Sequence, residues 1–443
     1  MRHIVVIGGG GAGMTAASRI RRLNKDVSIV VLEQKGFVSY ASCGIPYYVE
    51  GLVKQHGALI TYSPEFFKQK RKIAVHVNST VETVDVKSNT VTFVTENGRK
   101  HRSWDKLVLA TGAEPIKPPI PNIDLAQIFT VKYIEDAIKI RQAIPHTKNV
   151  AIVGGGYIGV EMAAAFRAQG KTVTLIEMLP HVLPNLDPAV SDIITQTMLD
   201  HGVNVQLEER VIEFRGTDSV EQVVTDTAHY DADLVIIAVG MKPNTTLAHD
   251  MGVRIGKTGA IEVLPTMQTN LPDVYACGDC VETMHRISGE KVWIPLAPTA
   301  NKMGYVAGTN ISNGLLEFPG VIGTAFTKTF DLHVGRTGLS EAQAKFHGFD
   351  PTSTMITTRS RAHYYPQGTK LIVKVVADKS SKQLLGAQCV GTETVTGHIN
   401  AIVPLLAAHA DIEDLFFSDF GYAPPFAQVW DPFIVASRVL GFA

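Results

Sequence analysis

Cys43 is the residue of this chain whose chemistry first needs an explanation. It lies in the stretch FVSYASCGIPYY, with glycine and proline close behind it and tyrosines on both sides. The chain has four cysteines in 443 residues, and their irregular spacing is not that of a disulfide framework. The thiol could be a buried core residue, half of a disulfide, a metal ligand or a catalytic nucleophile. In the last case the thiolate is the form that attacks.

Two glycine motifs, each placed between a strand and a helix, predict dinucleotide-binding sites. After the apolar run IVVI comes Gly-x-Gly-x-x-Gly, then a helix-compatible stretch, then a second strand that ends in an acid. The same order follows from NVAIVGGGYIGV onward. In such units the glycines allow a tight turn and close approach to a pyrophosphate, and the acid accepts from ribose hydroxyls. The residues assigned to these roles are Gly8, Gly10, Gly13 and Glu33 in the first unit, and Gly154, Gly156, Gly159 and Glu177 in the second.

The acid of the second unit favours NADH over NADPH. A carboxylate repels the 2′-phosphate of NADPH, and Met178, Leu179 and Pro180 follow Glu177 with no arginine to offset its charge. NADPH stays possible. Two dinucleotide sites in one chain suggest a hydride donor and a flavin that receives the hydride. We therefore expect FAD at the first unit and NADH at the second.

Three further segments are predicted to complete the cofactor sites. LVLATGAEP (residues 107–115) and LVIIAVGMKPN (residues 234–244) are buried strands closed by glycine, suited to crossings between two nucleotide domains. VYACGDC places an acid after a short strand and ahead of a helix whose N-terminus would face the pyrimidine end of a flavin. The residues predicted to contact cofactors in these segments are Thr111, Gly112, Gly240 and Asp279, together with Ala297 at the start of the following helix.

Composition excludes several other classes of function. Hydrophobic residues make up 45% and charged residues 19%, as in folded soluble proteins, and the length suggests about three domains. A formal net charge of −1 gives no field that favours nucleic acid or an anionic membrane, so neither is an expected partner. The sparse cysteines predict a reduced, cytoplasmic protein.

Together these elements resemble the pyridine nucleotide–disulfide oxidoreductases over the whole chain. The resemblance implies an α/β fold with two Rossmann-like dinucleotide-binding domains of the glutathione-reductase-like type and a C-terminal α+β dimerisation domain. It implies a discontinuous FAD-binding domain over residues 1–113 and 244–321, and an NAD(P)H-binding domain over residues 114–243. Residues 322–443 would form the interface of a homodimer whose active sites lie between the subunits.

The surroundings of Cys43 resemble one branch of that family. Its best-known members carry a C-x4-C redox pair, but Tyr48 stands where the second cysteine would be, which rules out an internal disulfide at this site. The stretch resembles the single-cysteine branch of coenzyme A–disulfide reductases, persulfide reductases, NADH oxidases and NADH peroxidases. There the cysteine is implied to cycle as a mixed disulfide or a sulfenic acid. Peroxidases and water-forming oxidases are implied to carry a histidine aligned with Gly11, so glycine there disfavours peroxide chemistry.

Two C-terminal motifs, AHYYPQG and GYAPPFAQVWDP, resemble stretches of the coenzyme A–disulfide reductases and their archaeal persulfide-reducing relatives. There, tyrosines of the partner subunit reach the active-site cysteine. The resemblance assigns this role to Tyr422, and to Tyr364 in preference to Tyr365. A phenol can protonate the thiolate that departs when a disulfide is attacked. The alternative is that these tyrosines only pack a dimer interface.

Coenzyme A ends in a 3′-phospho-ADP group that needs positive charge. The runs SRIRRLNK and EFFKQKRK supply cations that would lie near Cys43 in this fold, although a solvated basic face is the alternative. Residues that match coenzyme A contacts in the family are Arg22, Ser39, Ser42, Arg71 and Asn301. Tyr157 and Glu161 match family residues near the nicotinamide, where the tyrosine would cover the flavin until NADH displaces it.

The remaining thiols are interpreted as structural. Cys277 and Cys280 have C-x-x-C spacing, but they enclose the Gly-Asp of the flavin motif and no second pair accompanies them. Cys389 alternates with apolar neighbours in LLGAQCVG, the second strand of a hairpin that begins with LIVKVVAD and precedes an apolar helix.

The favoured function is an FAD-dependent NAD(P)H:disulfide oxidoreductase that reduces coenzyme A disulfide, persulfide or polysulfide through Cys43. An NADH oxidase that uses a sulfenic acid at Cys43 is one alternative. A flavin-bound redox sensor with negligible turnover is another.

Overall fold

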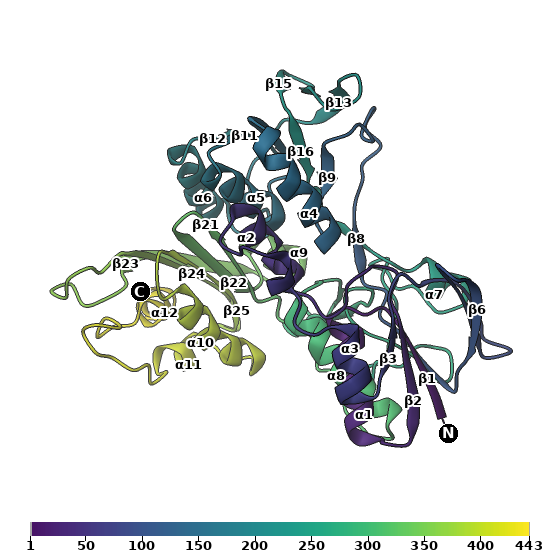
Figure 1. The fold of residues 1–443 in the computed structure, drawn as a ribbon. Coiled ribbons are helices and arrows are strands. Elements are labelled where there is room, and N and C mark those ends of the chain that lie inside the picture. The colour runs from purple at the N-terminus through teal and green to yellow at the C-terminus, as the bar shows by residue number, and fades with distance from the viewer. Residues whose placement is uncertain (1, 443) are drawn as a thin grey trace.

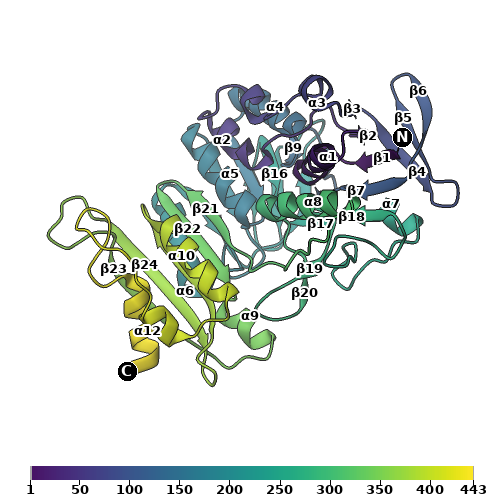
Figure 2. The same ribbon diagram turned by 90° about the horizontal axis from the view of Figure 1, so that it is seen from below.

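The computed structural model describes residues 2–442 and contains three sheets of five strands, together with smaller sheets. In Figure 1 the N-terminal strands (purple) lie in a first lobe, the elements labelled β11, β12 and β16 in a second lobe, and the C-terminal helices (yellow) in a third lobe. Figure 2 shows the C-terminal sheet alongside the second lobe, where β21 contacts α5 and α6.

The first sheet is parallel and has the order β18-β7-β1-β2-β3. Its central strands are β-branched runs buried on both faces, as parallel strands between helices are. Helices α1 and α8 pack against each other over it. The bounds are β1 Arg2–Ile7, α1 Gly11–Leu23, β2 Val27–Leu32, β3 Ala74–His76, β7 Lys106–Leu109, β18 Val274–Ala276 and α8 Ala297–Ile311.

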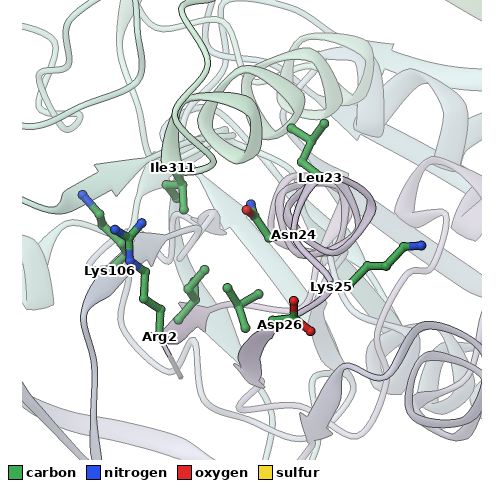
Figure 3. Close-up of a pocket in the computed structure, with 9 residues that line it drawn as sticks. Arg2, Leu23, Asn24, Lys25, Asp26, Lys106 and Ile311 are labelled. Carbon is green, nitrogen blue, oxygen red and sulfur yellow. The ribbon is translucent and has the colours of Figure 1, made fainter.

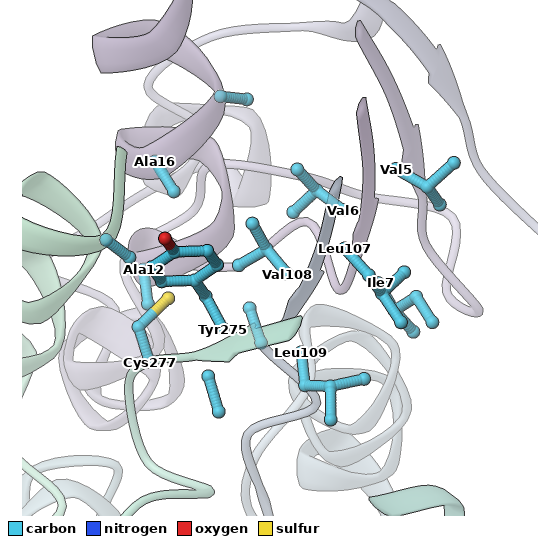
Figure 4. Close-up of a cluster of buried hydrophobic side chains, with 14 of the residues drawn as sticks. Val5, Val6, Ile7, Ala12, Ala16, Leu107, Val108, Leu109, Tyr275 and Cys277 are labelled. Carbon is cyan, nitrogen blue, oxygen red and sulfur yellow. The ribbon is translucent and has the colours of Figure 1, made fainter. Parts of the chain in front are cut away.

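Figure 4 shows the core of this sheet, in which side chains of β1, β7 and β18 meet the small residues of α1. Cys277 lies in that cluster and is fully buried, and Cys280 is buried beside it. Burial raises the pKa of both thiols. The prediction that these two cysteines belong to the core is confirmed.

The second sheet repeats the same design, in the order β12-β11-β10-β16-β9. Strand β10 pairs in parallel with β11 and β16, just as β1 pairs with β2 and β7. The bounds are β9 Ile128–Thr130, α4 Ile134–Ala143, β10 Asn149–Val153, α5 Tyr157–Ala168, β11 Thr172–Ile176, α6 Pro188–Asp200, β12 Val203–Gln206 and β16 Leu234–Ile237. An antiparallel sheet of β13 Val211–Arg215, β14 Gln222–Thr225 and β15 His229–Asp231 follows β12.

The chain passes between these two sheets twice, at adjacent places. Strand β8, Ala113–Pro115, leaves the first sheet, and β17, Met241–Pro243, returns from the second. The two pair with each other in antiparallel register, Ala113 opposite Pro243. The predicted crossing segments are thus the two strands of one ribbon.

The third sheet is antiparallel, in the order β21-β22-β25-β24-β23. The predicted hairpin is β24 and β25, the predicted helix is α10, and Cys389 of β25 is fully buried, so these predictions are confirmed. The bounds are β21 Ala325–Thr329, β22 Leu332–Gly338, α9 Glu341–Phe346, β23 Pro351–Arg359, β24 Lys370–Asp378, β25 Leu384–Gly391, α10 Val395–Ala407, α11 Ile412–Phe416 and α12 Pro432–Phe442.

A buried ionic network joins the second sheet to the third. Lys374 of β24 lies 3.3 Å from Asp187 Oδ2 at the start of α6 and also pairs with Glu341. Gln388 of β25 donates to the same Asp187 oxygen at 2.6 Å. Lys374 and Asp187 are almost completely buried. Separating the second sheet from the third would leave these buried charges unpaired, which is costly. The network therefore fixes how the two sheets pack together.

The remaining elements lie outside the three five-stranded sheets. A separate antiparallel sheet of three strands precedes β7, and short elements lie between β17 and α8. Their bounds are β4 Thr80–Asp85, β5 Thr90–Thr95, β6 Gly98–Ser103, α7 Thr246–Asp250, β19 Thr283–Met284 and β20 Lys291–Val292.

Figure 3 shows a pocket of 340 Å³ at the amino ends of β1, β2 and β7, lined by Arg2, Lys106 and the end of α1. Ligands of open parallel sheets bind at the opposite, carboxyl edge, so this pocket is not part of the nucleotide sites. Among residues 2–442, no helix combines the length and the apolar character needed to span a membrane.

Candidate active site

The first glycine loop joins β1 to α1, and its backbone leaves room for a ligand. Gly8 has φ of +108°, and a Cβ there would fall 2.0 Å from Ala110 O, so only glycine fits. A Cβ on Gly13 would fall 2.0 Å from Gly8 O, so this glycine allows the helix to approach the strand. Around Gly10 nothing lies within 4 Å of the Cβ position. The open space therefore begins where a pyrophosphate would lie at the start of α1.

Glu33 closes this loop from the end of β2. Its Oε2 accepts from Gly9 N at 2.7 Å, and its Oε1 accepts from Lys35 N at 2.8 Å. Burial is the largest influence on this carboxyl and raises its pKa, against the two backbone hydrogen bonds. The sequence predicted a contact from Glu33 to ribose. The structure adds that the same carboxylate fixes the shape of the glycine loop.

The second loop, between β10 and α5, has the same geometry. Gly154 has φ of +107°, a Cβ on Gly159 would fall 1.9 Å from Gly154 O, and Gly156 again has nothing within 4 Å. Glu177, only 6% exposed, accepts from Gly155 N at 2.6 Å and from Leu179 N at 2.8 Å. Each loop therefore fits one dinucleotide pyrophosphate, with an acid beside it.

The two crossing segments are joined to each other by hydrogen bonds. Thr111 Oγ1 donates to Asn244 O at 2.7 Å, and Asn244 N donates to Gly112 O at 2.9 Å. Ile116 N donates to Gly240 O at 3.0 Å. Of the predicted cofactor residues, Thr111, Gly112 and Gly240 thus lie at the paired crossing.

Asp279 and Ala297 lie where the sequence predicted them, after β18 and at the first position of α8. Lys132, just ahead of α4, lies 3.4 Å from Asp279 Oδ2, and Trp293 Nε1 donates to Asp279 O at 2.7 Å. Lys132 brings a cation from the second lobe to the predicted flavin acid. No motif in the sequence pointed to Lys132.

Cys43 lies in the 3₁₀ turn Ser42–Gly44, directly before helix α2, Ile45–Glu50. Ser39, four residues earlier, has φ of +50°, and its N–H donates to Gly9 O at 3.0 Å. This contact brings the Cys43 segment beside the first glycine loop. The structure thus places Ser39, Ser42 and Cys43 in one stretch next to the predicted FAD site.

Cys43 is the one exposed cysteine among residues 2–442, since Cys277, Cys280 and Cys389 are buried. Tyr48, where a family partner cysteine would stand, is 8% exposed and packs edge-on against His56 with ring centroids 6.4 Å apart. The thiol of Cys43 is therefore open to a ligand from solution.

Tyr364 and Tyr422 are brought together. Their hydroxyl oxygens lie 3.0 Å apart, although 58 positions separate them in the sequence. This hydrogen bond raises the pKa of Tyr422. The two side chains are 64% and 42% exposed in the single chain, so they form a phenol pair on the surface of the third lobe.

The predicted coenzyme A residues gather around α1. Asn301 of α8 accepts from Thr15 Oγ1 at 2.7 Å, and it lies 3.5 Å from the Cβ position of Gly11. Arg19 donates to Thr309 Oγ1 at 2.9 Å and lies over the Tyr305 ring. Sequence motifs did not single out Thr15, and Arg19 was only one cation of a basic run. Arg22, on the same helix, is exposed.

Arg71 is held in a defined position. It ends helix α3, Pro64–Arg71, and donates to Ser18 Oγ on α1 at 2.6 Å. The guanidinium lies 5.0–5.4 Å from the ring centroids of Tyr62, Phe66 and Phe67. The charge of Arg71 is thus stacked and half-buried rather than freely solvated.

Tyr157 and Glu161 lie in the first turns of α5. Burial raises the pKa of Tyr157, and the charge of Arg336 partly offsets this effect. Glu161 Oε1 accepts from Thr327 Oγ1 of β21 at 2.8 Å, and burial raises the pKa of Glu161. The second lobe and the third sheet therefore meet at Glu161.

Two parallel sheets of one order, each with a glycine loop closed by an acid, define an oxidoreductase that uses FAD and a pyridine nucleotide. The chain belongs to the pyridine nucleotide-disulphide oxidoreductase family, which residues 2–304 match. Residues 324–432 match the dimerisation domain of the same family. Membership confirms the predicted family, fold class and cofactors, FAD and NAD(P)H.

Several proteins are similar over nearly the whole of this chain. The NAD(P)H sulfur oxidoreductase (CoA-dependent) of Pyrococcus abyssi is 47% identical, covering 100% of this chain and 98% of that protein. An NADH oxidase of Methanocaldococcus jannaschii is 39% identical, covering 98% and 97%. The structure of an NAD-dependent persulfide reductase from A. fulgidus matches with a TM-score of 0.97 and 38% identity, covering 99% of this chain and 82% of that one.

Proposed function

We propose that this enzyme reduces coenzyme A disulfide, or a coenzyme A persulfide or polysulfide, with electrons from NAD(P)H. The observation that carries the proposal is the exposed thiol of Cys43 beside the first glycine loop, with every other cysteine of residues 2–442 buried. A thiol in this position cannot form an internal disulfide, so its sulfur partner must come from solution. The names of the Pyrococcus and A. fulgidus relatives support coenzyme A and persulfide chemistry.

FAD, when bound, supplies two electrons taken as hydride from NAD(P)H. The Cys43 thiolate attacks one sulfur of coenzyme A disulfide, the bond between Cys43 and that sulfur forms, and the original S–S bond breaks. One coenzyme A thiolate departs. Two electrons then cleave the mixed disulfide, which returns the Cys43 thiolate and releases the second coenzyme A thiolate.

The paired phenols are suited to protonate the departing thiolate. Tyr422 and Tyr364 share a hydrogen bond that holds the two hydroxyls together, and a phenol O–H of this pair can donate to the departing sulfur. In the proposed homodimer this pair reaches Cys43 of the opposite subunit, as the family resemblance implies. Exposure of both rings in the single chain supports a role at an interface.

The cations around α1 provide for the 3′-phospho-ADP end of coenzyme A. Arg71 is preorganised by Ser18 and three aromatic rings, while Arg22 projects from the end of α1. Ser39 and Ser42 lie in the segment just before Cys43, and Asn301 lies on α8, the helix that packs against α1. A fixed guanidinium loses little freedom when it binds a phosphate, which supports Arg71 as an anchor.

The test is steady-state NADH oxidation by the purified enzyme with coenzyme A disulfide, coenzyme A persulfide, hydrogen peroxide or oxygen as acceptor. We expect the sulfur substrates to give the highest kcat/KM, and Cys43→Ser to abolish that activity. Mass spectrometry of the resting protein would reveal a coenzyme A adduct on Cys43. Full disulfide reduction by Cys43→Ser would refute the mechanism.

An NADH oxidase is the second candidate, favoured by the name of the Methanocaldococcus jannaschii relative. The exposed Cys43 could then cycle through a sulfenic acid. Gly11 leaves only Asn301 near the position where a histidine would assist O–O cleavage, which weighs against peroxide chemistry. Oxygen consumption with a kcat equal to that of disulfide reduction would favour the oxidase.

A further inference from the structure

The phenol pair is carried by two segments that belong to no helix or strand. Tyr364 lies in residues 360–369, between β23 and β24 (the first phenol loop). Tyr422 lies in residues 417–431, between α11 and α12 (the second phenol loop). Loops keep a fixed shape only where other contacts hold them. The distance of 3.0 Å between the two hydroxyl oxygens therefore requires contacts that join the two loops.

Gln428, in the second phenol loop, provides such contacts. Its Nε2 donates to Thr358 Oγ1 at 2.7 Å and to Arg359 O at 2.7 Å. Both acceptors lie at the end of β23, directly before the first phenol loop. A carboxamide has two N–H donors, so the amide nitrogen of Gln428 is fully used at this place. One backbone hydrogen bond, from Ala362 N to Pro424 O at 3.3 Å, adds to the junction.

Each phenol loop is also anchored at its base, independently of the other loop. Arg361 Nη2 donates to Glu393 Oε2 at 2.6 Å, and Glu393 follows β25 of the third sheet. His398 Nε2 of α10 lies 3.4 Å from Oδ2 of Asp431, the last residue of the second phenol loop. Neither contact joins the two loops. Among the described residues, the side-chain hydrogen bonds that connect the second loop to the first loop and to β23 are those of Gln428 and of the phenol pair itself.

We propose that Gln428 is the positioning residue of the phenol pair. By fixing the second phenol loop to the end of β23, it keeps the hydroxyls of Tyr364 and Tyr422 within hydrogen-bond distance. The inference rests on the proposed function for what the phenols do, but not for their pairing. In that function a phenol O–H gives its proton to the departing coenzyme A thiolate, which becomes a thiol, and solvent returns a proton to the phenolate.

The first test compares two disulfides whose leaving groups differ in basicity. Coenzyme A disulfide releases a basic alkyl thiolate, whereas the mixed disulfide of coenzyme A with thionitrobenzoate releases a weakly basic aromatic thiolate that leaves without a proton. Gln428→Glu has the same length but no N–H donor near neutral pH. We expect it, and also Gln428→Ala, to lower kcat/KM for coenzyme A disulfide by about tenfold. The release of thionitrobenzoate from the mixed disulfide should change by less than about twofold.

The matched control is Gln383→Ala. Gln383 is likewise a half-buried glutamine of the third lobe, and its Nε2 lies 3.0 Å from His409 Nδ1, outside both phenol loops. We expect this variant to keep both rates. Equal losses with the two disulfides in Gln428→Glu would mean that the residue only supports the fold, and this result overturns the proposal.

The second test detects the pairing of the phenols without any disulfide substrate. In protein labelled with fluorotyrosine, the fluorine NMR resonance of Tyr422 is assigned by its loss in Tyr422→Phe. Tyr364→Phe should move this resonance in the otherwise unchanged protein, because it removes the hydrogen bond. In the Gln428→Glu background the same substitution should move it far less, because the pair is already separated.

No shift in the unchanged protein, or an equal shift in both backgrounds, overturns the positioning role. This outcome does not depend on catalysis. If the unchanged enzyme reduces neither coenzyme A compound, the proposed function fails, and the NMR spectra still decide whether Gln428 positions the phenols.

Discussion

Replacing Gly156 by alanine should separate nucleotide binding from folding. Gly156 is the residue before α5, with φ of −72° and ψ of −175°, which alanine adopts without strain. No protein atom lies within 4 Å of the Cβ that the substitution adds. The fold should therefore accept the methyl group, and the free energy of unfolding should change by less than about 0.5 kcal/mol.

Binding of the nucleotide, in contrast, should be weakened by the added methyl group. The space next to Gly156 is where backbone N–H groups must approach the pyrophosphate, and a methyl group there keeps them apart. Hydrogen bonds to a charged group are worth about 1.5–3 kcal/mol each. Loss of one such contact should raise the Kd for NADH by about ten- to hundredfold.

The assay is quenching of protein fluorescence by NADH under anaerobic conditions, together with thermal unfolding of the same sample. Gly397→Ala is the control, because that glycine is also in open space but lies in α10, in the third lobe. Gly154→Ala should instead unfold the loop, since its Cβ would fall 2.5 Å from Ala238 O at a φ of +107°. An unchanged NADH affinity in Gly156→Ala would show that the pyrophosphate lies elsewhere.

Variants at three other places test other parts of the structure. Tyr422→Phe and Tyr364→Phe should each lower kcat for disulfide reduction by about tenfold or more, and the double variant should lose little beyond the worse single one, because the two phenols share a hydrogen bond. Burial lowers the pKa of His398, but the hydrogen bond and charge of Asp431 outweigh burial and raise it overall. This pair should therefore stabilise the protein fully below about pH 6.5 and lose its contribution as pH rises through the higher folded value, a slope that unfolding of His398→Gln should lack. Lys374→Met should destabilise the protein by about 3–5 kcal/mol, seen as a lower Tm, because it leaves buried carboxylates unpaired.

Local sequence patterns predicted the strand–loop–helix units well. The glycine spacing reflects close contacts within a few residues, such as Gly13 against Gly8, and these contacts do not depend on the rest of the chain. Glu33 and Glu177 were also predicted from local patterns, because each follows the second strand of its strand–loop–helix–strand unit. Their hydrogen bonds to the loop amides of Gly9 and Gly155 could not be read from the spacing, because carboxyl direction depends on tertiary packing.

Contacts between distant segments were not predictable in the same way. The approach of Tyr364 to Tyr422 depends on how two loops of the third lobe fold over one another, and only family resemblance suggested these residues. Lys132 near Asp279 depends on the angle between two lobes. The packing of α2 against α5 is likewise expressed by no pattern within either helix.

The ribbon of β8 and β17 has a consequence for how this architecture can change. Because Ala113 pairs with Pro243, the chain segment between these two residues begins and ends at one place in the structure. A segment with adjoining ends can be exchanged for another at little cost in loop-closure entropy, provided that the buried contacts of Asp187 are kept. The segment between Ala113 and Pro243 can thus be exchanged as a unit, by recombination or in the laboratory, provided that its helices α4 and α5 keep their packing on α2, next to Cys43.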